Sequence, residues 1–244
     1  MIFTMNTADV LIIQNIPREK PGLLADILRQ ASVAYDVCDL DAGDALPKSG
    51  ADYKAVVVMG GPDSANDDTP KMQAEIAFVR NTIDRGIPYL GICLGLQVGV
   101  KAAGGSVVPG DVKEVGFLDA DGQQNSVELT EIGKASPLFE GMAERFNVFQ
   151  LHGETVELTP VMQVLAEGKH CRNQVVQIAN KAYGIQSHFE LTPDMLREWA
   201  AADPDLKPFK LQELLNDFRS VQGEYVQVAQ KLFDNFLRIA GLVA

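Results

Sequence analysis

The sequence predicts an α/β fold with a three-layer αβα architecture. Its central sheet is expected to be mostly parallel and doubly wound (flavodoxin-like), with a small antiparallel insertion and C-terminal helices. Two observations lead to this class. Short apolar runs rich in β-branched residues alternate with amphipathic stretches through the first hundred residues, and such runs are typical of strands buried on both faces. Proline or glycine punctuates nearly every junction between them. Alternating strands and helices favour a parallel sheet covered on both sides.

The first half of the chain supplies four predicted strands, at residues 9–14, 34–38, 55–59 and 88–92. Amphipathic helices are expected between them. The first begins at Pro21 and Gly22, the second runs from Pro70 to Gly86, and the third covers residues 94–103 before two glycines. Ligands bind such sheets beyond the carboxyl ends of the strands. Residues after Met59 and after Ile92 are therefore expected to face a site.

In the second half of the chain, the alternation of strands and helices gives way to consecutive strand-like segments and then to helices. Strand-like pieces in 106–129 flank Asp121-Gly122, a hairpin signal. Further strands are expected at 145–151, 161–166 and 173–179, with an extended piece at 183–188. Helices follow Pro193, separated by a proline-containing loop at 203–208. Two apolar helix faces are expected, one with Leu211, Leu214, Leu215 and Phe218, the other with Val226, Ala229, Phe233, Phe236 and Ala240. We predict one domain, residues 1–244, comprising a core (1–190) and a helical extension (191–244).

The composition of the chain disfavours some classes of ligand and some cellular locations. The chain has 33 acidic and 21 basic residues, a formal net charge of -12, which disfavours nucleic acid and anionic lipid as ligands. The most apolar window, residues 86–100, is too short and broken for a membrane span. No basic segment precedes an apolar stretch at the N-terminus, so no secretory signal is expected. Three cysteines do not suggest a disulfide framework, and a reducing cytoplasmic setting is the expectation.

A candidate nucleophile lies in Tyr89–Gln97 (YLGICLGLQ), where a predicted strand gives way to a helix. Cys93 stands at the corner, with Gly91 and Gly95 two residues to either side. This is the layout of a nucleophile elbow with cysteine in place of serine. A helix N-terminus also favours a thiolate. A cysteine without such a context is usually a small buried hydrophobe, and we interpret Cys38 and Cys171 in that way.

A thiolate needs a base, and the chain has three histidines. In an extended segment, residues two apart share a face, so His188 and Glu190 would lie side by side and the carboxylate could orient the imidazole. In isolation this pair would more often be a solvated histidine and a surface glutamate, but beside an elbow cysteine the catalytic interpretation is favoured. His152 is a weaker candidate that could line the pocket, and His170 reads as surface. The histidines are 18 residues apart, which is not a local metal-binding spacing, so no metal is expected.

The tripeptide Gly60-Gly61-Pro62 follows the third predicted strand. A backbone N–H here could face Cys93 and stabilise a developing oxyanion, together with the N–H of Leu94. An ordinary Gly-Pro turn is the alternative.

Together these motifs resemble those of the class I (triad-type) glutamine amidotransferases, over residues from about Val10 to about Trp199. The family's G-x-C-x-G-x-Q, Gly-Gly-Pro and His-x-Glu motifs are matched in order by Gly91, Cys93, Gly95 and Gln97, by Gly60, Gly61 and Pro62, and by His188 and Glu190. Two positions depart from the common pattern. Phe189 stands where the family usually has proline, which bears on the placement of Glu190, and Leu96 replaces a frequent His or Met.

The resemblance implies roles for individual residues. Cys93 would be the nucleophile, His188 the base and acid, and Glu190 the residue that orients His188. The N–H groups of Gly61 and Leu94 would form the oxyanion hole. Three further positions resemble those that contact the substrate: Gln97, Leu151 and His152. No cofactor is implied.

The implied reaction is hydrolysis of the γ-amide of glutamine through a γ-glutamyl thioester, with ammonia passed to an acceptor enzyme. The 54 residues after Glu190 cannot hold a synthetase domain, so the chain looks like a stand-alone, GMP-synthase-like member. Two alternatives remain. One is a γ-glutamyl peptide hydrolase with the same triad. The other is a non-catalytic regulatory or binding subunit, which only Phe189 supports.

Overall fold

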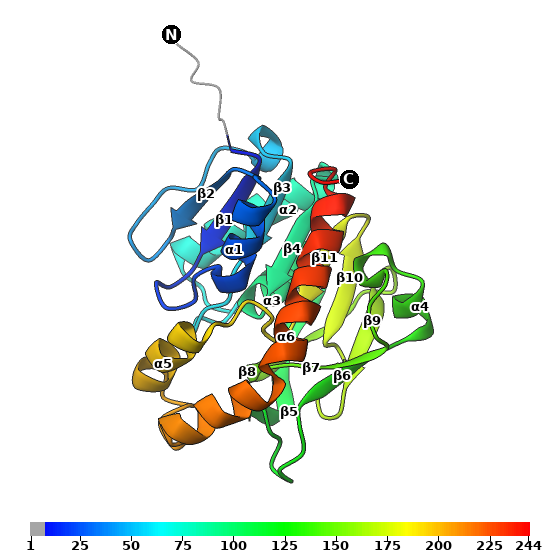
Figure 1. Ribbon diagram of the computed structural model, residues 1–244. Coiled ribbons are helices and arrows are strands. Elements are labelled where there is room, and N and C mark those ends of the chain that lie inside the picture. Colours follow the sequence, from blue (N-terminus) through cyan, green and yellow to red (C-terminus); the bar gives the residue numbers. More distant parts are fainter. Residues whose placement is uncertain (1–7) are drawn as a thin grey trace.

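A nine-stranded mixed sheet forms the centre of the molecule in the computed structural model, which describes residues 8–244. The strand order is β2-β1-β3-β4-β11-β10-β9-β6-β7. Helices cover both faces (Figure 1). The predicted α/β fold class is confirmed. Residues 1–7, which belong to the N-terminal stretch without a secretory pattern, lie outside the described residues.

One half of the sheet is parallel. Its strands are β2 (Tyr35–Asp39), β1 (Val10–Gln14), β3 (Ala55–Val58), β4 (Tyr89–Ile92) and β11 (Ala182–Ile185). In register, Gly91 of β4 lies between Val58 of β3 and Gly184 of β11. Because the strands run in the same direction, the segments that follow β1, β3, β4 and β11 all emerge at one edge of the sheet.

The other half is antiparallel and continues from β11 through β10 (Val175–Ala179), β9 (Gln163–Gly168), β6 (Ser126–Leu129) and β7 (Arg145–Asn147). A separate two-stranded antiparallel sheet pairs β5 (Ser106–Gly116) with β8 (Gln150–Glu157). This small sheet lies near the carboxyl edge of the parallel half, because Leu151 of β8 accepts a hydrogen bond from Cys93, directly after β4.

Two apolar cores hold the layers together. On one face of the sheet, α1 (Gly22–Gln30) and the C-terminal part of α6 (Leu211–Ile239) pack on alternate residues of β1, β3 and β4. On the other face, α2 (Pro70–Asp84) and α3 (Leu94–Ala102) pack on the intervening residues (Figure 1). Side chains that point alternately to the two faces explain why these strands are apolar throughout.

The shorter helices serve local roles. The turns η1 (Gly50–Asp52) and η2 (Pro137–Phe139) and helix α4 (Glu131–Lys134) are each capped by a serine or threonine side chain that accepts a backbone N–H. Helix α5 (Pro193–Ala202) begins at Thr192-Pro193 as predicted, and together with the start of α6 it forms a third apolar cluster. Within residues 8–244, no helix is long and apolar enough to cross a membrane.

Two predictions about the middle of the chain differ from the structure in detail. The expected strand 145–151 is divided between β7 and β8, which lie in different sheets. The change occurs at Val148 and Phe149, both fully buried, where the backbone pairs with Asn125 and then with His188. A continuous apolar run does not reveal such a change of partner. The hairpin predicted at Asp121-Gly122 forms but is short: Leu118 and Gln124 pair antiparallel across the turn, whereas β5 and β6 pair with other strands.

Three apolar residues that were expected to be buried are exposed. Val161 is 82% exposed and precedes β9. Leu211 and Val226 lie on α6 but are exposed, although both were expected on apolar faces. The buried stripe of this single continuous helix passes through Tyr225 instead. In a helix each residue turns the side chain by about 100°, so Val226 lies beside the stripe and not within it.

Candidate active site

Cys93 occupies a sharp bend between β4 and α3. Its backbone has φ 51° and ψ -105°, a conformation that non-glycine residues rarely adopt. The Cys93 N–H donates to the Ile185 carbonyl of β11 at 2.7 Å, which ties the bend to the neighbouring strand. The elbow predicted from the sequence is therefore present, and the parallel sheet holds it in place.

The two flanking glycines are required by close backbone contacts. A Cβ on Gly91 would lie 2.3 Å from the carbonyl group of Gly95, and a Cβ on Gly95 would lie 2.2 Å from the Val58 oxygen. The buried Tyr89 hydroxyl donates to the Gly95 carbonyl at 2.6 Å. Side chains at 91 or 95 would thus push α3 away from the sheet and displace the thiol.

The Cys93 thiol is buried but borders a pocket. Its Sγ lies 3.8 Å from the Leu151 carbonyl oxygen and 3.7 Å from the Gln186 amide nitrogen, which donates to it. The thiol also stands at the N-terminus of α3, where unpaired N–H groups favour negative charge. Gln186, from the segment after β11, is a neighbour of the thiol that the sequence reading did not single out.

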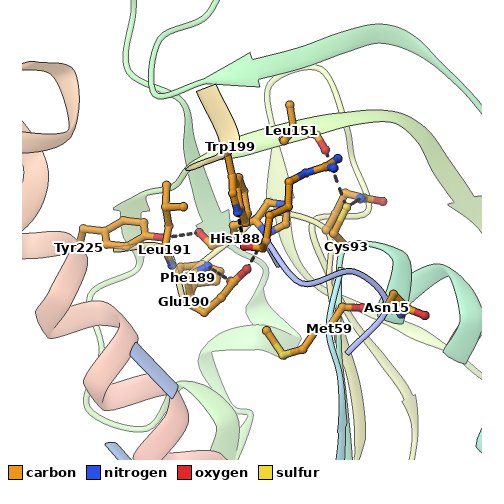
Figure 2. A network of polar contacts seen from close by, with 12 residues as sticks. Asn15, Met59, Cys93, Leu151, His188, Phe189, Glu190, Leu191, Trp199 and Tyr225 are labelled. Carbon is orange, nitrogen blue, oxygen red and sulfur yellow. Dashed lines mark hydrogen bonds and ion pairs between the residues drawn. The ribbon is translucent and has the colours of Figure 1, made fainter. Parts of the chain in front are cut away.

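His188 and Glu190 are joined as the sequence predicted. His188 Nδ1 lies 2.7 Å from Glu190 Oε1, and both side chains are almost wholly buried. Burial alone lowers the pKa of His188, but the Glu190 charge and hydrogen bonds with Cys93 and Glu190 together raise that pKa well above its usual value. In Figure 2, His188 lies between Cys93 and Glu190. The arrangement can stabilise an imidazolium beside a thiolate.

Aromatic residues and backbone bonds fix the position of His188. The Trp199 ring meets the imidazole edge to face, with centroids 4.9 Å apart. The His188 N–H donates to the Phe149 carbonyl, and the Tyr225 hydroxyl of α6 donates to the His188 carbonyl, both at 2.9 Å (Figure 2). Residues far apart in the sequence therefore hold this histidine against the parallel sheet: Phe149 before β8, Trp199 of α5 and Tyr225 of α6.

The predicted oxyanion residues flank the thiol. Gly61 and Leu94 line the same pocket as Cys93, and a Cβ on Gly61 would lie 3.0 Å from Leu94 Cδ2. Leu94 is the first residue of α3, so its N–H has no acceptor within the helix. Both residues therefore border the pocket together with Cys93.

The pocket has a volume of about 360 Å³. It brings together the six predicted residues Gly61, Cys93, Leu94, Gln97, Leu151 and His152. His188 and Glu190 do not line it; they lie buried behind Cys93. His170 is half-buried in the loop after β9 and does not belong to the pocket lining.

Glu19 is a pocket residue that the sequence reading missed. It follows β1, 4% exposed, and its Oε2 lies against Gly60, where an added Cβ would come within 2.1 Å of that oxygen and 3.2 Å of His188 Cε1. Burial raises the pKa of Glu19 to about 7; the nearby His188 opposes this shift and the Glu190 charge adds to it. The rule about carboxyl ends of strands, applied to β1, would have identified this segment.

The outer rim of the pocket carries charged residues. Its acidic members are Asp63, Glu154, Asp203 and Asp205, and Lys113 lies among them. Several form ion pairs: Arg18 contacts Asp203 at 2.8 Å and Lys113 contacts Asp205 at 2.7 Å. Asp203 and Asp205 come from the loop predicted at 203–208, which therefore contributes to the site as well as joining α5 to α6.

One cluster beside the pocket has the composition of a metal-binding group. Potential ligand atoms of Glu114, His152 and Cys171 lie within 4.8 Å of one another, and all three residues are buried.

Comparisons with known proteins agree with this geometry. The family model described as glutamine amidotransferase class-I matches residues 22–198. The glutamine amidotransferase-like protein YfeJ of Salmonella typhimurium is 33% identical over 156 residues, 62% of each chain. A GMP synthase (glutamine-hydrolyzing) of Mesorhizobium japonicum is 30% identical over 201 residues, covering 80% of this chain but 36% of that protein. The chain thus spans less than two thirds of the length of these relatives.

Two further proteins extend the comparison. A γ-glutamyl-L-1-hydroxyisopropylamide hydrolase of a Pseudomonas species is 28% identical over 143 residues, 57% of this chain and 48% of that protein. The crystal structure of a glutamine amidotransferase from Thermotoga maritima superimposes with a TM-score of 0.82 at 27% identity, covering 96% of this chain and 99% of that one. The matched family model, the fold and the arrangement of the motifs agree. This chain therefore belongs to the class I glutamine amidotransferase family.

Proposed function

We propose that this protein hydrolyses the γ-amide of glutamine, with Cys93, His188 and Glu190 as a catalytic triad. The observation that supports this most strongly is the buried chain of contacts from the Cys93 thiol at the α3 N-terminus, through His188, to Glu190 at 2.7 Å. A thiol in this setting is activated by an adjacent imidazole, and the imidazole is oriented by a carboxylate.

In the proposed reaction, the Cys93 thiolate attacks the γ-carbonyl carbon of glutamine. The tetrahedral oxyanion would be held by the N–H groups of Gly61 and Leu94. The imidazolium of His188 gives its proton to the departing nitrogen, so that ammonia leaves and a γ-glutamyl thioester remains. Water, deprotonated by His188, then attacks the thioester, which releases glutamate and restores the thiol. Loss of one oxyanion donor should cost about 10²–10³ in rate.

We propose that residues lining the pocket position the substrate. We assign contacts with the glutamine skeleton to Gln97, Leu151 and His152, which line the pocket beside Cys93. The buried carboxyl of Glu19, from the segment after β1, borders the same pocket. We propose that ammonia released here passes to an acceptor enzyme, since one relative is named a glutamine-hydrolyzing GMP synthase.

A γ-glutamyl amide hydrolase is the second candidate function. The Pseudomonas relative acts, by its name, on a γ-glutamyl amide with a substituted nitrogen. The same acyl transfer would apply, with an amine in place of ammonia as leaving group. The charged rim of the pocket, from Asp203 and Asp205 to Lys113, would then meet that amine.

One assay set tests both candidates. Glutamate release would be measured with glutamine and with a series of γ-glutamyl amides and dipeptides, for wild type and C93A. Turnover of glutamine that is abolished in C93A, and that rises when a second protein is added, supports the amidotransferase. Turnover of substituted amides alone supports the hydrolase. A lack of turnover, together with no labelling of Cys93 by a glutamine-like chloroketone, would point to a non-catalytic subunit and overturn the proposal.

A further inference from the structure

We propose that Glu114, His152 and Cys171 form a zinc-binding site beside the pocket. The site is separate from the triad but shares His152 with the pocket lining. The ligand atoms are one carboxylate oxygen, one imidazole nitrogen and one sulfur, all within 4.8 Å of one another. The spacing of histidines argued against a metal because it considered local sequence only. Here β5, β8 and the loop between β9 and β10 each supply one residue.

The orientation of His152 is the observation that most strongly points to a cation. Its Nδ1 lies 3.1 Å from the Glu154 carbonyl oxygen, so Nδ1 carries the proton that makes this hydrogen bond. The other nitrogen, Nε2, then presents its lone pair to the cluster. It is buried and has no hydrogen-bond partner among the described residues, and Glu114 Oε2 lies 3.3 Å away.

Two electron-rich atoms face each other in this arrangement, and a third is close by. A lone pair and a carboxylate oxygen repel unless a positive charge lies between them. A proton on Nε2 would satisfy only that pair, whereas a metal ion would bind the nitrogen, the oxygen and the Cys171 sulfur together. In zinc sites, a ligating histidine commonly donates its other ring N–H to a backbone carbonyl, as Nδ1 of His152 does here.

The donor set and distances favour zinc. Zinc accepts nitrogen, oxygen and sulfur ligands together, with bonds of about 2.0–2.3 Å in a tetrahedron. Ligand atoms around such an ion are then roughly 3.3–3.7 Å apart, from the same bond lengths. Atoms already within 4.8 Å need only small side-chain movements to reach these separations.

Neighbouring polar groups complete the site. The Thr155 hydroxyl lies 3.2 Å from the Cys171 sulfur. The Gln174 amide nitrogen donates to Glu114 Oε2 at 3.4 Å, and its oxygen is buried without a partner among residues 8–244. Rotation of that amide would offer the oxygen as a fourth ligand. The loop is fixed, because Gly168 N–H donates to the Cys171 carbonyl at 3.0 Å.

The test uses the C93A protein, so that the reactive thiol cannot bind metal. We expect about one equivalent of zinc per chain by elemental analysis, and a thiolate-to-metal charge-transfer band in the near ultraviolet when cobalt replaces zinc. Removing Cys171 from this background (C171A) should abolish the band and weaken zinc binding at least about 100-fold. Removing Cys38 instead (C38A) should change neither, because Cys38 is likewise a buried free cysteine but is not among these ligands.

Folding is monitored separately. Zinc should raise the melting temperature of C93A and leave that of C93A/C171A unchanged. If C171A fails to fold, E114Q keeps the shape of the side chain and should still reduce zinc affinity. The proposal is overturned if folded C93A retains no zinc and gives no cobalt band, if the band survives without Cys171, or if E114Q binds zinc as tightly as its parent. Glutamine turnover by the wild type tests the proposed triad separately, because none of the three proposed zinc ligands belongs to that triad.

Discussion

The backbone N–H of Phe189 donates to Glu190 Oε2 at 2.9 Å. The other carboxylate oxygen, Oε1, binds His188, so both oxygens of this buried group are engaged. The residue that departs from the family's usual proline is thus the donor of this bond, since proline has no N–H. The Phe189 side chain is itself buried and contacts Phe146 and Tyr225. At this position the departure adds a contact to the candidate triad.

The first prediction concerns that N–H. F189A should lower the free energy of unfolding by about 3–5 kcal/mol through the lost aromatic side chain. F189P loses the same side chain and also a hydrogen bond to a charged group, about 1.5–3 kcal/mol, partly offset by about 0.4–1 kcal/mol from the stiffer unfolded chain. Denaturant unfolding should therefore find F189P less stable than F189A. Equal stabilities would show that the N–H contributes no more than the stiffer unfolded chain restores.

The second prediction concerns the elbow. A Cβ at position 95 would meet the Val58 carbonyl at 2.2 Å, so G95A should destabilise the fold by at least about 3 kcal/mol and reduce turnover on the order of 100-fold by moving the thiol. Gly223 of α6 is the matched control. Nothing lies within 4 Å of its Cβ position, so G223A should stabilise the protein by about 0.5–1 kcal/mol and leave turnover unchanged. Thermal unfolding and glutaminase assays of both variants check this, and an active, stable G95A would contradict it.

The third prediction concerns the pH dependence of stability. Burial raises the pKa of Glu19 and of Glu75 from 4.5 to about 7. Between these values the folded state holds a proton that the unfolded state has lost, so stability falls as the pH rises from 4.5 to 7, by about 3 kcal/mol per carboxyl when complete. E19Q and E75Q should each flatten the decline seen in denaturant melts from pH 5 to 8. Variants with the wild-type slope would refute the burial argument.

Activity distinguishes the two carboxyls. Glu19 borders the pocket and lies near His188, whereas Glu75 lies beneath Asn15, whose amide donates to it at 3.1 Å. We expect E19Q to shift the pH profile of kcat/KM and E75Q to leave its shape unchanged. A wild-type profile in E19Q would separate this carboxyl from the chemistry.

The fourth prediction concerns His188. Its folded pKa is raised above the unfolded value near 6.5, so the charged pair stabilises the protein below that pH, and this contribution is lost as the pH rises through the elevated folded pKa. E190Q removes the Glu190 charge that opposes the effect of burial. Histidine NMR titrations should show His188 titrating at lower pH in E190Q, with turnover reduced on the order of 10²–10⁴-fold. H170Q, outside the pocket, assigns one of the other signals. An unmoved His188 signal would exclude Glu190 as the cause.

Much of the fold and part of the site were predictable from the sequence because the relevant signals are local. The bend at Cys93 needs glycines at fixed offsets, and His188 and Glu190 share a face because they are two apart in an extended segment. The strand-end rule points to the segment after β1, but only the tertiary structure shows that the Glu19 carboxyl lies against Gly60. The division of 145–151 between two sheets was hidden because both parts are equally apolar.

The Tyr225 hydroxyl donates to the His188 carbonyl and accepts from the Leu191 N–H at 3.3 Å. Its helix is separated from Cys93 by more than a hundred positions of chain, so a ribosome synthesises the thiol well before the residue that anchors its base. Full assembly of the reactive centre must therefore await translation of α6. A nascent chain arrested before Tyr225 would lack this anchor, and its His188 carbonyl would have no donor from α6.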